Sequence, residues 1–323
     1  CDTVNRVDCS ACHAYIAEDY FSSEHGKAYF EKDPDAPYCT DCHGSHKTLS
    51  HLNELDSTYR ANIPSLCGDC HEKLADSERL LTPQGHVLID YSSSVHGIGL
   101  ADKGLLPSAV CSDCHTSHYI LNSKDERSTT HYKNVATTCA TCHKGIYDDF
   151  VFSIHSPSVN ETDKKLPNCD DCHSAHRVSQ IAQDKFMSEV THQCGSCHKD
   201  LSETYLETMH GKTYTLGYMS AAKCSDCHGA HNIKSHFDPE SKVGFNNVVE
   251  TCKKCHPDAN RRFTGYLTHA THHDKTKYPA LYFTFWAMTS LLIGVFSFFG
   301  FHTLLWLPRS FAHLKVKREH EAK

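Results

Sequence analysis

The chain has 323 residues, of which 19 are cysteine and 28 are histidine, far above the content of an ordinary soluble protein. Only 39% of the residues are hydrophobic, and many of these lie in one block near the C-terminus, so the remainder cannot build a large side-chain core. The net charge of −7 provides no basic surface and argues against a nucleic-acid partner.

Eighteen of the cysteines occur in nine Cys-x-x-Cys-His strings, where residue abundance alone predicts about 0.1. Cysteines three apart lie about one helical turn from each other and can reach the two vinyl groups of one haem. The next histidine then projects onto the iron as the proximal ligand. Disulfides or zinc would not explain a histidine after every pair. The attachment residues predicted are Cys9, Cys12, Cys39, Cys42, Cys67, Cys70, Cys111, Cys114, Cys139, Cys142, Cys169, Cys172, Cys194, Cys197, Cys224, Cys227, Cys252 and Cys255. The proximal ligands predicted are His13, His43, His71, His115, His143, His173, His198, His228 and His256.

In these strings the chain resembles the multihaem c-type cytochromes, over roughly residues 9 to 272. The resemblance implies nine covalently bound haem c groups and a periplasmic location, because haem c is attached outside the cytoplasm in that family. It also implies electron transfer as the function.

The strings alternate in character and define a repeat. A first motif is followed by an isolated histidine, here named the helix-end histidine, and a second motif carries another histidine three residues after its own, here named the second-motif histidine. Two-motif repeats are predicted at 1–60, 61–134 (with an insertion), 135–190 and 191–248, and a half repeat at 249–278. The helix-end histidines are His25, His96, His155, His210 and His269, and the second-motif histidines are His46, His118, His176 and His231.

These nine histidines match nine irons in number, so we expect two histidine ligands on every haem. His46 is too close to His43 to reach the opposite face of the same haem, so the second-motif histidines are expected to serve a neighbouring haem. His269 lies one residue out of register, and His272 and His273 are alternatives to it.

The expected fold is all-α and loop-rich, with short helices around a stacked chain of haems and one C-terminal transmembrane helix. About 31 residues per haem make the porphyrins the apolar core and leave neighbouring macrocycles near contact. Two histidine ligands leave no open iron position, and the absence of methionine ligands favours low potentials, as suits menaquinol-linked anaerobic respiration.

Residues 280–307 contain no charged side chain and exceed the roughly 20 residues needed to cross a bilayer. Pro279 fits the first turn of this helix and Pro308 is expected to end it, so the span is predicted at 279–308. The basic tail at 309–323 is expected in the cytoplasm, which places the haem domain on the periplasmic side of the cytoplasmic membrane.

Two further features concern the membrane. Cys1 lies outside the nine motifs and resembles the lipid-modified first residue of bacterial lipoproteins. The segment around His302 resembles first-helix sequences of the b-type partners in menaquinol-oxidising cytochrome bc complexes. This resemblance implies a membrane b-type cytochrome or other quinol-oxidising subunit as partner, with periplasmic redox proteins, and a contact of His302 with haem b or quinol.

The expected function is therefore the electron-transfer subunit of a quinol-oxidising complex, with no catalytic residue and no enzyme activity by itself. Two alternatives stay open. A multihaem reductase of nitrite, hydroxylamine or a sulfur oxyanion would need an open haem, and a protomer of an extracellular cytochrome filament would not need the C-terminal span.

Overall fold

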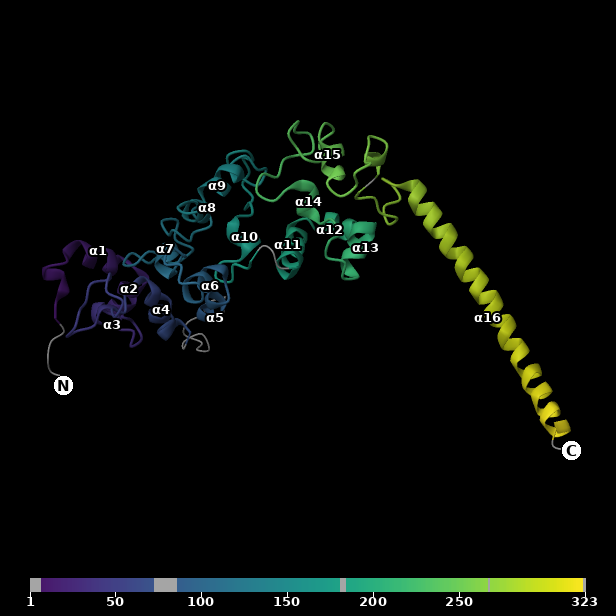
Figure 1. Cartoon of the computed structure of the whole chain (residues 1–323), viewed down its shortest axis with the longest axis horizontal. Helices are drawn as coiled ribbons and strands as arrows, with labels where there is room; N and C mark the ends of the chain where they lie inside the picture. The colour runs from purple at the N-terminus through teal and green to yellow at the C-terminus, as the bar shows by residue number, and fades with distance from the viewer. Residues whose placement is uncertain (1–6, 73–85, 181–183, 267, 322–323) are drawn as a thin grey trace. The chain divides into compact units, whose positions relative to one another are not determined.

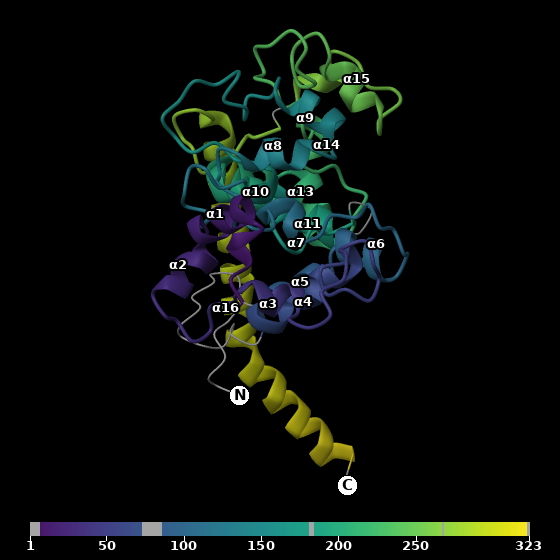
Figure 2. The same ribbon diagram turned by 90° about the vertical axis from the view of Figure 1, so that its left-hand side faces the viewer.

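The computed structural model describes residues 7–72, 86–180, 184–266 and 268–321, and within them the chain is helical without a β-strand. Figures 1 and 2 show short helices separated by loops, followed by one long helix, α16. The expected all-α, loop-rich class is confirmed. The elements are η1 Cys9–Ala11, α1 Ala14–Ser22, α2 Glu24–Phe30, α3 Cys39–His43, η2 Arg60–Asn62, α4 Ile63–His71, α5 Val87–Ser92, α6 Val95–Ala101, α7 Cys111–His115, α8 Val135–Ala140, α9 Lys144–Phe150, α10 Cys169–His173, α11 Asp184–Cys197, α12 Lys199–Glu207, α13 Met209–Thr215, α14 Cys224–His228, α15 Val248–Lys253, η3 Phe263–Gly265 and α16 Pro279–Glu321.

The chain divides into two compact units. The first contains Cys1–His198 and Ala222–Thr264, and the second contains Lys199–Ala221 and Gly265–Lys323. The division runs through the fourth repeat, because α12 and α13 belong to the second unit whereas the second-motif helix α14 belongs to the first.

Few side chains in the described residues form a conventional core. The buried hydrophobic residues are Ala17, Tyr38, Leu100, Val110, Leu121, Tyr205, Tyr214, Ala221 and Ala259. Of the side chains buried most completely, Val110 is the only large apolar one, and the others are serines. A chain of this length normally buries many aliphatic residues, so hydrogen bonds are the more informative contacts in this protein.

Helix α16 is long and apolar enough to cross a membrane, which confirms that part of the prediction by length and composition. The stretch Pro279–Leu314 has 36 residues with a mean hydropathy of 1.8, and none of its most apolar window is buried in the protein. The predicted end at Pro308 is wrong, because α16 continues through this proline to Glu321. Proline removes one backbone donor, but helix-forming residues such as Leu304, Ala312 and Leu314 flank it on both sides.

Candidate functional site

The second motif of each repeat forms a five-residue helix that begins at its first cysteine and ends at its proximal histidine, as seen in α3, α7, α10 and α14. The aspartate in the middle of the motif caps this helix by accepting from the backbone N–H of the residue before the first cysteine. The pairs are Asp41 with Tyr38 at 2.6 Å, Asp113 with Val110 at 2.8 Å, Asp171 with Asn168 at 2.9 Å, and Asp226 with Lys223 at 2.7 Å. The cap fixes the turn that carries both cysteines and the histidine. Its sequence signal, Cys-x-Asp-Cys-His, went unused in the sequence analysis.

The residue after each of these proximal histidines has a positive φ, with values of 73° at Gly44, 65° at Thr116, 61° at Ser174 and 85° at Gly229. This conformation reverses the chain direction immediately before the second-motif histidine. Two of the positions are not glycine and therefore carry backbone strain. Their hydroxyls compensate, because Thr116 Oγ1 donates to the Tyr119 carbonyl at 2.8 Å and Ser174 Oγ donates to the Arg177 carbonyl at 2.7 Å.

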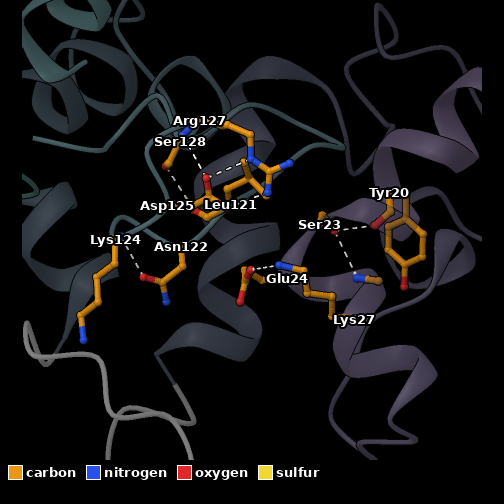
Figure 3. Close-up of polar contacts among 11 residues, drawn as sticks. Tyr20, Ser23, Glu24, Lys27, Leu121, Asn122, Lys124, Asp125, Arg127 and Ser128 are labelled. Carbon is orange, nitrogen blue, oxygen red and sulfur yellow. Dashed lines mark hydrogen bonds and ion pairs between the residues drawn. The ribbon is translucent and has the colours of Figure 1, made fainter. Parts of the chain in front are cut away.

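A buried hydroxyl lies two residues before each of the first four helix-end histidines. These residues are Ser23, Ser94, Ser153 and Thr208, with exposed fractions of 0%, 0%, 1% and 7%. Ser23, Ser94 and Thr208 each accept the backbone N–H of the following glycine at 3.1 Å, and Ser153 accepts the N–H of His155 at 3.3 Å. Ser23 also donates to the Tyr20 carbonyl at 2.6 Å, and both residues are labelled in Figure 3. Ser23, Ser94 and Thr208 are N-caps that set the start of a new helix and so the position of the histidine, whereas turns follow Ser153.

Backbone hydrogen bonds join each repeat to the next. The residue just before a helix-end histidine donates its N–H to the carbonyl two residues after the second-motif histidine of the following repeat. The three bonds are Glu24 to Ile120 at 2.8 Å, Val95 to Val178 at 2.8 Å and Ile154 to Ile233 at 2.7 Å. Figure 3 shows the first of these junctions, where the α1–α2 turn faces the loop of residues 121–128. These backbone bonds thus connect the segment of a helix-end histidine in one repeat with the segment of a second-motif histidine in the next repeat.

Twelve predicted ligands form six imidazole pairs, each with one proximal and one distal histidine. The ring centres are 6.0–6.2 Å apart in His25–His71, His43–His118, His96–His143, His115–His176, His155–His198 and His173–His231. Two metal–imidazole bonds of about 2.0 Å, with about 1.1 Å from each nitrogen to its ring centre, place two centres about 6.2 Å apart. The adjacent imidazoles of His272 and His273, which contact each other directly, have ring centres 3.9 Å apart. The pairs therefore fit two axial ligands on one iron.

The pairs follow one register. Three helix-end histidines, His25, His96 and His155, pair forward with the first motif of the next repeat. Three second-motif histidines, His118, His176 and His231, pair backward with the second motif of the preceding repeat. The interplanar angles also separate the two kinds, at 34–38° for the forward pairs and 14–20° for the backward pairs. Every pair thus joins two repeats, and His118, His176 and His231 lie beside a neighbouring repeat, whereas His46 belongs to none of the six pairs.

Burial keeps many of these imidazoles neutral. Desolvation, and secondarily the facing His176, lowers the pKa of His115 to about 4. Desolvation likewise lowers the pKa of His25, His71, His96, His118, His155, His173 and His176. A neutral imidazole keeps the nitrogen lone pair that a metal requires, so this electrostatic environment suits ligation.

The nine motifs lie in a row that follows their order in the sequence. Within a repeat, the first cysteines of the two motifs lie beside each other, as in Cys9–Cys39, Cys67–Cys111, Cys139–Cys169 and Cys194–Cys224. Between repeats, the last cysteine of a second motif lies near the first cysteine of the motif that follows it in the chain. Burial raises the pKa of this last cysteine most, and the neighbouring cysteine raises it further. These contacts are Cys42–Cys67, Cys114–Cys139, Cys172–Cys194 and Cys227–Cys252. The 18 cysteines of the described residues form no disulfide.

The other predicted site residues fall outside the six pairs. His13 and His46 are exposed, and His46 Nδ1 lies 3.0 Å from Ser45 Oγ. His228 and His256 belong to the first compact unit and His210 and His269 to the second, so the ligand roles of these four stay predictions. His302 is exposed on α16, and Cys1 lies outside the described residues.

The structure separates His269 from its two alternatives. The His269 ring hydrogen-bonds to the backbone of Leu201, and its Nδ1 lies 3.2 Å from Thr204 Oγ1. Such bonds orient a ligating imidazole. His272 and His273 instead face the carboxylate of Glu207, with nitrogen–oxygen distances of 3.6 and 3.0 Å.

No protein-family model, curated protein or solved structure matches the chain.

Proposed function

We propose that the chain is a membrane-anchored nonahaem c-type cytochrome that transfers electrons along a row of haems with two histidine ligands each. The observation that carries this proposal is the set of six proximal–distal imidazole pairs at 6.0–6.2 Å. Neither disulfides nor zinc sites of cysteine pairs would bring histidines of neighbouring repeats to this separation.

When bound, the haems would supply iron that can take up and release an electron. The cysteines would attach each porphyrin covalently, and the two paired imidazoles would hold its iron and keep substrates from it. Because consecutive motifs are in contact along the row, an electron has a short path from each haem to the next. These features favour conduction over catalysis at the six paired positions.

The proposed setting is the periplasmic face of the cytoplasmic membrane, in a complex that oxidises quinol. Helix α16 supports an anchor by its length and composition. The basic residues after Pro308 favour a cytoplasmic C-terminus. We propose a b-type cytochrome or other quinol-oxidising subunit as the partner and lipid on Cys1 as a second anchor. Mass spectrometry of the N-terminal peptide tests the lipid, and an unmodified thiol would remove it from the proposal.

Two measurements test the cofactor and its ligands. The intact mass of the denatured protein is expected to exceed that of the bare chain by nine haems, and a smaller excess would mean that a motif is empty. Electron paramagnetic resonance of the oxidised protein is expected to show only low-spin iron. A substantial high-spin signal in the wild type would instead favour the reductase alternative.

Replacing one member of a pair tests the register. In His118→Ala the haem attached to Cys39 and Cys42 loses its second axial ligand, so one haem in nine becomes high-spin. His51→Ala is the matched control, because His51 is exposed and lies outside the six pairs. Identical low-spin spectra for both variants would show that His118 does not bind iron.

A further inference from the structure

A cluster of three metal-binding side chains lies in the second compact unit, apart from the proposed haem ligands. Glu207 at the end of α12 faces His272 and His273, and the ligand atoms of the three residues all lie within 4.8 Å of one another. Glu207 and His272 are partly buried, with side-chain exposures of 28% and 27%, whereas His273 is 69% exposed. One side of the cluster is thus accessible to an ion from solvent.

The cluster results from matching spacings on two segments. Leu201, Thr204 and Glu207 are three residues apart on α12 and share one helix face. His269 contacts Leu201 and Thr204, and three residues later His272 comes to lie beside Glu207. The His272 ring also packs on Phe285 near the start of α16, with ring centres 3.8 Å apart.

One of the two oxygens of the Glu207 carboxylate has no hydrogen-bond partner. Its Oε2 atom is buried and accepts no hydrogen bond, and the nearest ring nitrogen, His272 Nδ1, is 3.6 Å away. A buried charged oxygen without a partner costs free energy, and a bound cation would remove that cost. This atom is a second indication of a ligand, independent of the grouping of the three residues.

We propose that Glu207, His272 and His273 bind a divalent transition metal of the Zn²⁺ class. Two imidazoles and one carboxylate are a known three-ligand set for zinc, with water in the fourth position, whereas Mg²⁺ and Ca²⁺ prefer oxygen ligands. Ligand atoms about 2.0 Å from a tetrahedral ion are about 3.3 Å from one another. The carboxylate–imidazole distances of 3.0 and 3.6 Å lie on either side of that value. The ion fastens α12 to the segment that leads into α16.

The test uses the full-length haem-loaded protein without a polyhistidine tag, stripped with a chelator, titrated with Zn²⁺ and separated from free metal. Zinc and iron are counted per chain by elemental analysis, with the chain quantified by its amino acids. The wild type is expected to retain one zinc more than Glu207→Gln or His273→Ala, whose affinity falls at least tenfold. Zinc is also expected to raise the melting temperature of the wild type but not of these variants.

Two matched controls separate this site from general binding to surface histidines. Glu203→Gln changes an exposed carboxylate one turn earlier on α12, and His192→Ala removes an exposed histidine of the first compact unit. Both are expected to retain as much zinc as the wild type. Equal zinc in the wild type and Glu207→Gln, or an equal loss in the controls, would refute the site. The iron count reports separately on the haem proposal.

Discussion

Replacing Ser23 by alanine tests whether a buried cap positions the helix-end histidine. The Ser23 hydroxyl accepts the N–H of Gly26 at 3.1 Å and donates to the Tyr20 carbonyl at 2.6 Å, and the residue has no exposed surface. Loss of an N-cap costs about 1 kcal/mol. The N–H left buried without a partner raises the expected loss in free energy of unfolding to about 2 kcal/mol.

The assay combines denaturant unfolding with electron paramagnetic resonance. His25 lies two residues after the cap and pairs with His71, so Ser23→Ala is also expected to broaden the low-spin signal of the haem at Cys67 and Cys70. Ser23→Thr is expected to retain stability, because Thr208 makes the same cap in the fourth repeat. Ser22→Ala is the control, since Ser22 is exposed and immediately adjacent. Equal stability of Ser22→Ala and Ser23→Ala would refute the capping argument.

Three further predictions concern a glycine, a tyrosine and the membrane helix. Gly97→Ala is expected to cost at least about 2 kcal/mol of unfolding free energy, because its Cβ would lie 2.2 Å from the Tyr91 carbonyl oxygen. Gly145→Ala, with nothing within 4 Å, should be neutral or slightly stabilising in the same denaturation assay. Burial raises the pKa of Tyr91 to about 12, so the unfolded chain ionises this phenol first and stability falls from pH 10 to 12. Tyr91→Phe should show a shallower fall in alkaline melting curves, and an unchanged slope would contradict the assignment. His302→Leu is expected to lower quinol oxidation or b-haem content in the assembled complex without changing c-haem content, and unchanged values for both would make His302 a packing residue.

The sequence was sufficient to predict the helical class and the long apolar helix, and the candidate ligands stood out because the Cys-x-x-Cys-His strings and the histidines around them recur at fixed spacings. Spacing along the chain does not, however, state which histidine meets which motif. That depends on the reversal at Gly44 and its equivalents and on cross-repeat bonds such as Glu24 to Ile120. The continuation of α16 past Pro308 was missed because a proline inside a helical segment can kink the helix instead of ending it.

The cap before the helix-end histidine could have been found in the sequence. Ser-Glu-His-Gly at 23–26, Ser-Val-His-Gly at 94–97 and Thr-Met-His-Gly at 208–211 share a hydroxyl and a glycine around the histidine. The cluster at Glu207 could not, because the carboxylate and His272 are 65 residues apart and only the fold brings them together.

The alternating direction of the imidazole pairs bears on how such a chain can lengthen. An internal repeat contains two histidines predicted as proximal ligands and two predicted as distal ligands. One of the distal histidines pairs with the following repeat, and the other pairs with the preceding repeat. A tandem duplication of one repeat therefore adds as many distal histidines as proximal histidines at each new junction. Growth by whole repeats keeps the internal imidazole pairs complete, whereas insertion of a single motif would leave a histidine without a partner.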